Sequence, residues 1–310
     1  MIKKIILKLI CVFSIVFCQD WGGQSGSFLR MGMTARSIAM GGGFTADLDN
    51  NFPVFYNPAW SAFLTKRHFG SSYSNLTLDR RLASTSISFA LPPTAGLGIA
   101  WVYGGVSNIQ GRYSTGMKSL KMQTGENAIL ITFAQRILPW MSIGANFKIL
   151  RYDLPMTQAD QVSGSGIGFD IGILIKTGDY STFGVMVQDV SSNYQWDTNE
   201  LYAQGGPYKE NFPTIYRIGT RFKKNGMNIA GDVGIITDHE SYYGILPRAG
   251  VEYAFLDQYY FRGGYGNGRL GFGLGYKYGL FSPNDSQIDY AFSMDWVSQT
   301  GHTISYAFNF

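Results

Sequence analysis

Apolar and small or polar residues alternate with a period of two in fourteen segments of the chain. Successive side chains of an extended strand point to opposite faces, so each segment predicts a strand with one apolar and one polar face. In 270–277, for example, Leu, Phe, Leu and Tyr alternate with three glycines and a lysine. The predicted strands are 67–76, 82–91, 95–104, 128–137, 141–150, 166–176, 181–189, 214–223, 227–235, 246–254, 258–265, 269–277, 287–295 and 302–310.

A soluble β-sandwich also alternates, but two features favour a membrane barrel. The polar faces are rich in glycine (39 in the chain) and only 15% of residues are charged, which suits a crowded interior better than a solvated face. The connections also alternate in length, as in outer-membrane barrels with short periplasmic turns and long external loops. Short ones are expected near 92–94, 138–140, 177–180, 224–226 and 256–257, and long ones near 105–127, 151–165, 190–213 and 236–245.

The strand lengths fit a membrane crossing, because a tilted membrane strand needs about 9–11 residues. Closure into a barrel removes the unpaired sheet edges that lipid does not tolerate. The sequence therefore predicts an all-β fold, a transmembrane antiparallel barrel of about 14 strands over 67–310, located in the outer membrane and in contact with its lipid. The final strand ends on an aromatic face, Tyr306, Phe308 and Phe310, which resembles the C-terminal signal recognised by the barrel-assembly machinery.

Residues 1–18 have the pattern of a secretory signal peptide. A basic start, Met-Ile-Lys-Lys, precedes an apolar stretch of about 14 residues, which is shorter than the roughly 20 needed for a spanning helix. Cleavage is expected before Gln19. Lipid attachment at Cys18 is the alternative, although the bulky Phe17 stands where a small residue is wanted. Either form of processing takes Cys11 away, and plain cleavage leaves the mature chain without a thiol.

Residues 19–66 do not alternate and are predicted to form a plug or lumen-lining segment ahead of the barrel. Asn57 and Pro58 read as the start of a helix, with Asn57 as the N-cap. The stretch FLRMGMTARSIAMGGGFTADLDNNFPVFYNPAW resembles the N-terminal motif of the PorV/PorQ family of outer-membrane proteins, except that Trp60 replaces the usual glycine. The residues carrying this motif are Arg36, Met40, Gly41, Gly42, Asp47, Asp49, Asn57, Pro58 and Ala59.

The PorV/PorQ family is related to the fatty-acid transporter FadL, so the resemblance implies a FadL-like fourteen-stranded barrel with an N-terminal plug. It also implies partners, namely type IX secretion components and the C-terminal domains of exported cargo. Cargo binding or shuttling at the external loops is the first functional hypothesis. Aromatic residues of the loop 190–213, which either contact a partner or pack within the loop, are Tyr194, Trp196, Tyr202 and Tyr208.

FadL-like uptake of a hydrophobic small molecule is the alternative hypothesis, with plug residues such as Phe44, Phe52 and Phe55 lining an apolar pocket. Charged residues expected inside the barrel either brace it through ion pairs or line a polar path. These residues are Lys148, Asp170, Lys176, Arg217, Arg221, Arg248 and Glu252.

Other motifs carry little weight. GNGRLG at 266–271 has dinucleotide-loop spacing, but it lies between two predicted strands and reads as a hairpin. His68, His239 and His302 lack metal-ligand spacing. The pair Asp238–His239 lies on a predicted external loop, where polar residues in contact with solvent are a simpler explanation than catalysis.

The net charge of +4 is small and does not indicate nucleic-acid binding. We therefore predict no enzyme activity, no cofactor, no metal and no nucleic-acid partner.

Overall fold

The structure, a computed structural model, describes residues 23–49, 51–155, 161–199, 204–238, 240–295 and 300–310. The predicted signal peptide and Tyr202 lie outside these residues. Short helices precede the strands: η1 (Ser27–Arg30), α2 (Ala35–Ala39), α3 (Pro53–Tyr56) and η2 (Pro58–Phe63). The strands are β1 (His68–Leu76), β2 (Arg80–Leu91), β3 (Ala95–Arg112), β4 (Lys118–Leu138), β5 (Met141–Pro155), β6 (Gln161–Lys176), β7 (Ser181–Val190), β8 (Asn193–Asp197), β9 (Pro207–Asn211), β10 (Thr214–Lys224), β11 (Met227–Thr237), β12 (Tyr242–Phe255), β13 (Tyr259–Gly266), β14 (Arg269–Tyr278), β15 (Ser286–Asp295) and β16 (Thr300–Asn309).

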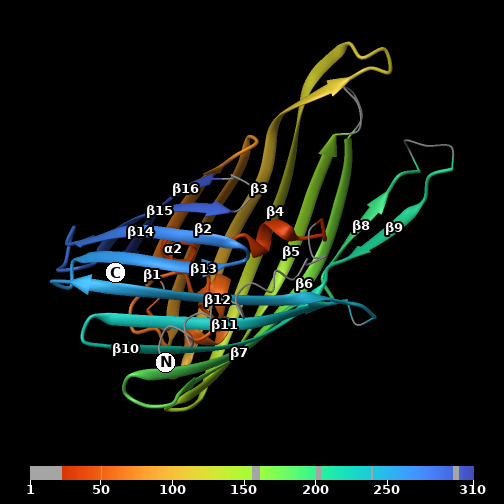
Figure 1. The fold of residues 1–310 in the computed structure, drawn as a ribbon. Coiled ribbons are helices and arrows are strands. Elements are labelled where there is room, and N and C mark those ends of the chain that lie inside the picture. Colours follow the sequence, from red (N-terminus) through yellow and green to blue (C-terminus); the bar gives the residue numbers. More distant parts are fainter. Residues whose placement is uncertain (1–22, 50, 156–160, 200–203, 239, 296–299) are drawn as a thin grey trace, which may run out of the picture.

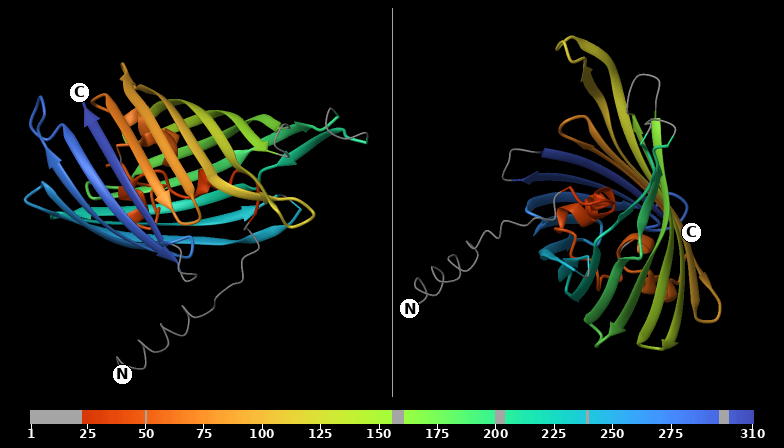
Figure 2. Two further views of the ribbon diagram at one scale, coloured as in Figure 1. Left: turned by 90° about the horizontal axis from the view of Figure 1, so that it is seen from above. Right: turned by 90° about the vertical axis from the view of Figure 1, so that its right-hand side faces the viewer.

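Fourteen of these strands close into an antiparallel barrel (Figures 1 and 2). Neighbours in the barrel follow the chain order, β7 pairs with β10, and β1 pairs with β16 to join the two ends. The remaining strands, β8 and β9, form a separate hairpin whose strand pairing with the barrel, within the described residues, is limited to the Ser165–Gln195 pair of β6 and β8. Every predicted alternating segment corresponds to one barrel strand, so the predicted fold class and strand number are confirmed.

The long connections are more ordered than the sequence indicates. The sequence predicts a loop at 105–127, but β3 and β4 continue pairing through much of this stretch, with irregular register after Val106. Residues 151–155 and 161–165 likewise extend β5 and β6. The loop 190–213 contains the β8–β9 hairpin, in which Trp196 pairs with Tyr208. Pairing with a neighbouring strand gives the backbone N–H and C=O groups hydrogen-bond partners. These stretches therefore form strands although their side chains do not alternate between apolar and polar. In Figure 1 the β3–β4 and β8–β9 hairpins project beyond their neighbours, and we call this end of the barrel the loop end.

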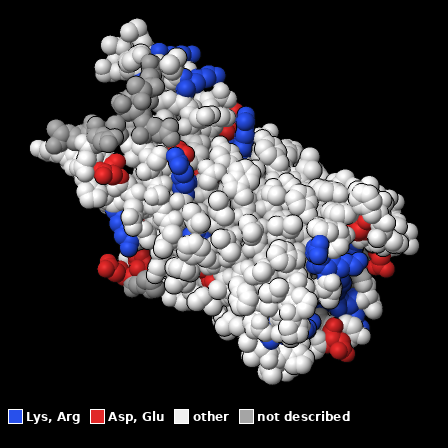
Figure 3. All heavy atoms as spheres, turned by 180° about the vertical axis from the view of Figure 1, so that it is seen from behind, with Lys and Arg blue, Asp and Glu red and all other residues white. Residues whose placement is uncertain are grey.

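The outer wall of the barrel is apolar. Ile218, Phe272, Leu274 and Ile304 are each more than half exposed, whereas their strand neighbours facing inward are buried glycines and polar residues. Figure 3 shows the resulting broad surface without charged side chains, with Lys, Arg, Asp and Glu gathered towards its ends. An outward apolar band around a polar interior is the arrangement of a barrel surrounded by lipid.

Residues 23–49 and 51–66 lie inside the barrel and are called the plug below (Figure 2). Helix η2 contacts strands β2–β6, and α2 contacts β13–β16 on the opposite wall. The Thr34 side chain caps α2 by accepting a hydrogen bond from the Ser37 N–H, and Pro53 and Pro58 occupy the first turns of α3 and η2. Among the described residues no helix has the length and apolarity required to cross a membrane.

Glycines on the inner face of the strands allow the plug to pack closely. A Cβ atom on Gly96 would overlap Ser61, and one on Gly144 would overlap Ala59. On the opposite wall a Cβ on Gly264 would overlap Met40. The glycine-rich inner face therefore reflects backbone contact with the plug rather than an open pore.

Candidate functional site: a cavity between plug and barrel

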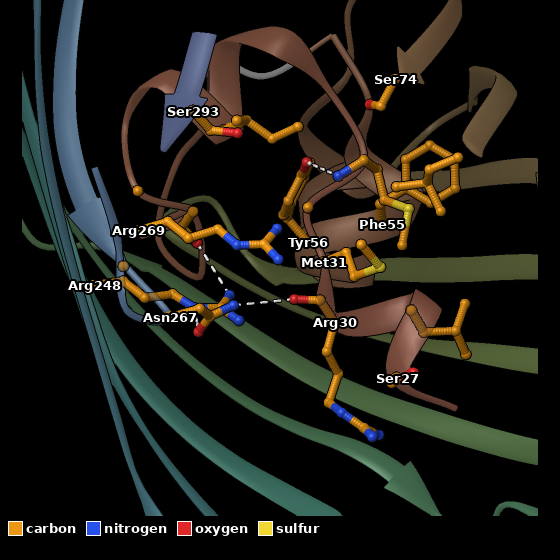
Figure 4. A pocket seen from close by; sticks show the side chains of 18 of the residues that line it. Ser27, Arg30, Met31, Phe55, Tyr56, Ser74, Arg248, Asn267, Arg269 and Ser293 are labelled. Carbon is orange, nitrogen blue, oxygen red and sulfur yellow. Dashed lines mark hydrogen bonds between the residues drawn. The ribbon is translucent and has the colours of Figure 1, made fainter. Parts of the chain in front are cut away.

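A cavity of about 230 Å³ lies at the loop end, between the plug and the barrel wall. Figure 4 shows that Arg248 and Arg269 point from the barrel towards plug residues such as Met31 and Tyr56. We call this space the plug cavity. Its wall combines residues of η1 and the following turn with the loop ends of barrel strands β1, β2, β7 and β10–β15.

One part of the plug cavity is apolar. Leu29, Met31 and Met33 line it from the plug, and Leu76 and Leu82 line it from β1 and β2. Leu82 and Met33 are almost fully buried. Methionine side chains are flexible and adapt to ligands of irregular shape. Phe55, one of the predicted pocket residues, lines this cavity, whereas Phe44 and Phe52 do not line it and pack behind the lining residues Tyr56 and Phe55.

The other part of the plug cavity is strongly basic. Five arginines line it, and among the described residues Asp232 is the only acidic one that does so. These arginines are Arg30, Arg80, Arg217, Arg248 and Arg269. Such an excess of guanidinium groups in a partly desolvated space attracts anions, and the planar guanidinium matches carboxylate or phosphate oxygens.

Several of these guanidinium groups have unused donors. Arg30 is 7% exposed and donates to the Gln24 carbonyl at 2.9 Å, but its Nε and Nη1 have no hydrogen-bond partner among the described residues. Arg217 Nη1 is 3.7 Å from Asp232 Oδ1 and makes no hydrogen bond within the described chain. The Arg269–Asp295 pair is also loose, at 3.9 Å. The Arg30 and Arg217 donors are therefore available to a ligand.

Asn267 connects the plug to the barrel beside these arginines. Its side chain accepts from Arg248 Nε at 3.1 Å and donates to the Arg30 carbonyl at 3.0 Å, as Figure 4 shows. Arg248 Nη1 donates to the Gly42 carbonyl at 3.3 Å. The motif GNGRLG is thus a β13–β14 hairpin, as predicted, but it also contributes Asn267 and Arg269 to the cavity. Neither residue was predicted as a site residue, nor was Arg80, because alternation identifies strand interiors rather than strand ends. Arg30 was not predicted either, because it lies in η1, where no strand periodicity applies.

The acidic residues of the N-terminal motif hold the plug in place. Arg36 pairs with Asp47 and, at 2.8 Å, with Glu252 of β12, while Asp47 also lies 3.3 Å from Arg221. Asp49 pairs with Arg221 and with Lys223, which is at the rim. Arg262 extends the network from Glu252 to Asp289. These ion pairs are mostly buried and cross-connected, so they tie the plug to β10, β12, β13 and β15.

The uncharged residues of the motif determine the conformation and packing of the plug backbone. Met40 is fully buried, and Gly41 and Gly42 have φ values of 68° and 80°, which favour glycine. A Cβ on Gly41 would overlap the backbone of Tyr265. Asn57 caps η2 by accepting from the Ala59 N–H at 3.1 Å. Pro58 fits the first turn of this helix, and Trp60, in place of the usual glycine, is buried against His68.

The predicted interior charges fall into two groups. Lys148 is buried between Asp170 (2.6 Å) and Asp189, and Arg217, Arg221, Arg248 and Glu252 lie as described above. Lys176 differs: it is exposed at the turn end, opposite the loop end, with its Nζ 4.0 Å from the Phe63 ring centroid. Only Arg217 and Arg248 of the predicted set reach the plug cavity.

Two of the predicted loop aromatics, Tyr194 and Trp196, are buried in a cluster that includes Leu150 of the barrel wall. Tyr194 and Trp196 pack against each other with ring centroids 5.7 Å apart, and Tyr208 is 64% exposed.

The Asp238 loop is a local turn: its carboxylate accepts hydrogen bonds from the Glu240 and Ser241 N–H groups and from the Tyr243 hydroxyl. The Tyr243 bond, followed by the backbone bonds, lowers the pKa of Asp238. In the described part of the chain, no three His, Cys, Asp or Glu side chains are grouped to hold a metal.

Comparison with solved structures identifies the fold. The fold is similar to the Pseudomonas putida toluene transporter TodX (TM-score 0.66, 15% identity, covering 90% of this chain and 99% of that one) and to the Ralstonia pickettii toluene transporter TbuX (0.65, 16%, 90% and 98%). It is also similar to a Pseudomonas aeruginosa FadL homologue (0.65, 11%, 90% and 98%). The chain therefore has the FadL-like fourteen-stranded fold and is a bacterial outer-membrane barrel. No protein-family model and no curated protein sequence matches it.

Proposed function

We propose that this barrel is an uptake channel for small amphipathic molecules that have an apolar body and an anionic group. The main support is the plug cavity, which places an apolar wall next to an excess of arginines. The fold adds support, because similar structures are toluene transporters and a monoaromatic hydrocarbon channel. An apolar cavity with a few oriented polar groups is the usual form of a small-molecule site.

The arginines distinguish this proposal from uptake of a neutral hydrocarbon. A neutral ligand would leave the Arg30 and Arg217 donors unpaired in a buried space, which costs free energy. An anionic group satisfies them and balances the charge. The apolar wall formed by Met31, Met33 and Leu82 then takes the rest of the molecule.

Passage through the barrel requires the plug to rearrange. A second cavity of about 340 Å³ lies at the turn end and is lined by Arg36, Asp49 and Glu252. The plug cavity and this space therefore lie on opposite sides of the ion pairs that hold the plug. Opening those pairs is the step that would connect the two cavities.

Equilibrium binding to the purified barrel tests the proposal. Octanoate should bind more tightly than octanol, and Arg269→Gln should weaken octanoate about tenfold while changing octanol little, since a charged hydrogen bond contributes about 1.5–3 kcal/mol. Arg112→Gln, at an exposed position on the β3–β4 hairpin, is the charge-matched control. Equal binding of acid and alcohol, or equal effects of the two substitutions, would contradict the proposal.

Cargo binding in type IX secretion is the second candidate, supported by the resemblance of the N-terminal motif to the PorV/PorQ family. The projecting β3–β4 and β8–β9 hairpins would carry the contact, with Tyr194, Trp196 and Tyr208 on the second one. Pull-down with the C-terminal domain of an exported protein tests it. Capture that is lost when 193–211 is replaced by a short linker supports this role, and no capture by the intact chain counts against it.

A further inference from the structure

A separate cavity lies under the β8–β9 hairpin, outside the plug cavity, and we call it the hairpin cavity. It measures about 620 Å³ and is bounded by the hairpin, by β4–β6 and by residues 23–27. Four aromatic side chains line it: Tyr152, Tyr194, Trp196 and Tyr208. The Tyr152 and Trp196 rings meet edge to face at 5.4 Å, so part of the wall is a fixed aromatic surface.

Two carboxylates, Glu126 of β4 and Glu210 of β9, face the same space. Glu126 accepts a hydrogen bond from the Tyr194 hydroxyl at 3.0 Å, and Glu210 accepts from Trp196 Nε1 at 2.9 Å and from Ser25. These donors are neutral. Neither glutamate forms a salt bridge within the described residues, although Arg30 is near enough to attract Glu126 electrostatically.

We propose that this hairpin cavity binds a small organic cation of the substituted ammonium class. Both carboxylates are half-buried and have no ion-pair partner in the described chain, so their loss of hydration costs free energy. The charge of a bound cation would offset this cost. Tyr and Trp rings attract ammonium groups through their negative faces, and methylated ammonium groups shed water easily enough to sit among them. The volume is within the range of small-molecule sites.

The alternatives fit the wall less well. A hard metal ion needs six or more oxygen ligands in the case of Ca²⁺, or nearly ideal octahedral geometry in the case of Mg²⁺, and aromatic rings supply neither. A neutral hydrophobic ligand would use the rings but would bury both carboxylates without compensation. An anion would be repelled by Glu126 and Glu210.

Calorimetric titration of the purified barrel with choline and with its neutral isostere 3,3-dimethyl-1-butanol tests the proposal. We expect choline to bind at least about tenfold more tightly, which corresponds to about 1.4 kcal/mol. Glu210→Gln and Glu126→Gln should each remove most of this preference. Glu210 is part of the hairpin, so Glu210→Gln could disturb the hairpin itself. Glu126 lies on a barrel strand, so Glu126→Gln then provides the test.

Two control variants separate this site from the plug cavity. Glu240→Gln changes an exposed acidic residue elsewhere at the loop end and should leave choline binding unchanged. Arg269→Gln should weaken octanoate but not choline. Absence of choline binding, equal affinity for its isostere, or equal effects of Glu126→Gln and Glu240→Gln would overturn the proposal while leaving the uptake proposal untouched.

Discussion

Asn57 illustrates how single side chains fix the plug. It is 2% exposed, caps η2, and donates to the Thr45 carbonyl at 2.8 Å and the Ile173 carbonyl at 3.2 Å. It therefore joins two parts of the plug to strand β6. A Cβ on Gly172 would overlap the Asn57 side chain, so the glycine of β6 makes room for it. The Asn-Pro-Ala motif is thus explained by local packing and hydrogen bonding.

Asn57→Ala should loosen the plug without preventing barrel formation. Loss of the cap and of two buried hydrogen bonds should cost about 2–4 kcal/mol. Limited proteolysis should then cleave within residues 23–66 faster than in the parent chain. Asn75→Ala, at an exposed position of β1, is the control and should leave cleavage unchanged. Equal protection of the plug in both variants would show that the cap is dispensable.

Asp285 orders the β14–β15 connection at the turn end. Burial favours its protonated form, but hydrogen bonds from the Leu280, Phe281 and Ser282 N–H groups and the Ser286 hydroxyl outweigh burial and lower its pKa to about 2. A lowered folded-state pKa stabilises the loop above the ordinary Asp pKa, and this contribution disappears as the pH falls through about 2.

Hydrogen exchange of the 280–282 amides should therefore be slow at neutral pH and should accelerate, relative to intrinsic rates, between about pH 4 and pH 2. Asp285→Asn should show fast exchange at neutral pH and little additional acceleration in acid. A loop that stays protected in this variant would contradict the assigned role of the carboxylate.

At the scale of elements, the two faces of each strand have different partners. On β13, Gly264 lies against Met40 and Gly41 of the plug, whereas a Cβ on the adjacent Gly263 would meet nothing within 4 Å. The inner face of the strand therefore has the shape that the plug backbone requires, whereas the outer face needs only to be apolar enough for lipid.

Gly264→Val should displace the plug, because the new side chain would occupy the position of the Met40 backbone. Gly263→Val points the same side chain outward and should be tolerated. The expected result is rapid proteolysis of the plug in the first variant only, with both barrels resisting heat-induced unfolding on electrophoresis. Comparable plug protection in the two variants would mean that residues 35–42 are not seated where the structure has them.

The ion pairs of the interior are a second link between elements. Lys148→Met would leave Asp170 and Asp189 buried without their shared cation, and should destabilise the barrel by about 3–5 kcal/mol. Denaturant unfolding measures the loss. Combining Lys148→Met with Asp170→Asn and Asp189→Asn should recover much of it, because no charge of this group then remains buried. Persistent loss in the triple variant would indicate a role beyond charge balance.

How far the sequence predicts these elements depends on their periodicity. The barrel strands were predictable because lipid and plug impose opposite chemistry on alternate residues, as in 270–277. The β8–β9 hairpin was not, because it stands apart from the barrel ladder and its aromatics Tyr194 and Trp196 are buried against plug and barrel residues far away in the sequence. The plug cavity was missed for a related reason: Arg30, Arg80 and Arg269 are distant in the chain and meet only once the barrel closes.

At the scale of the whole molecule, the apolar outer wall requires a lipid environment. Leu274→Arg would place a charge on this wall and should cost about 2–4 kcal/mol if it lies near the bilayer centre. Insertion into bilayers of the purified, unfolded chain should be impaired. Leu120→Arg is the control: Leu120 is 63% exposed, but it lies on the projecting part of the β3–β4 hairpin, so insertion should proceed normally. Equal insertion of both variants would contradict a lipid-facing position for Leu274.

Spin labels placed singly along β14 test the closed, lipid-facing barrel most directly. Labels at Phe272, Leu274 and Tyr276 should be accessible to oxygen dissolved in the bilayer and shielded from a water-soluble relaxation agent. A label at Leu120, which is 63% exposed on the projecting part of the β3–β4 hairpin, should instead be reached by the water-soluble agent. Equal exposure of the β14 labels and the Leu120 label to the water-soluble agent would show an open or soluble sheet and would contradict the account.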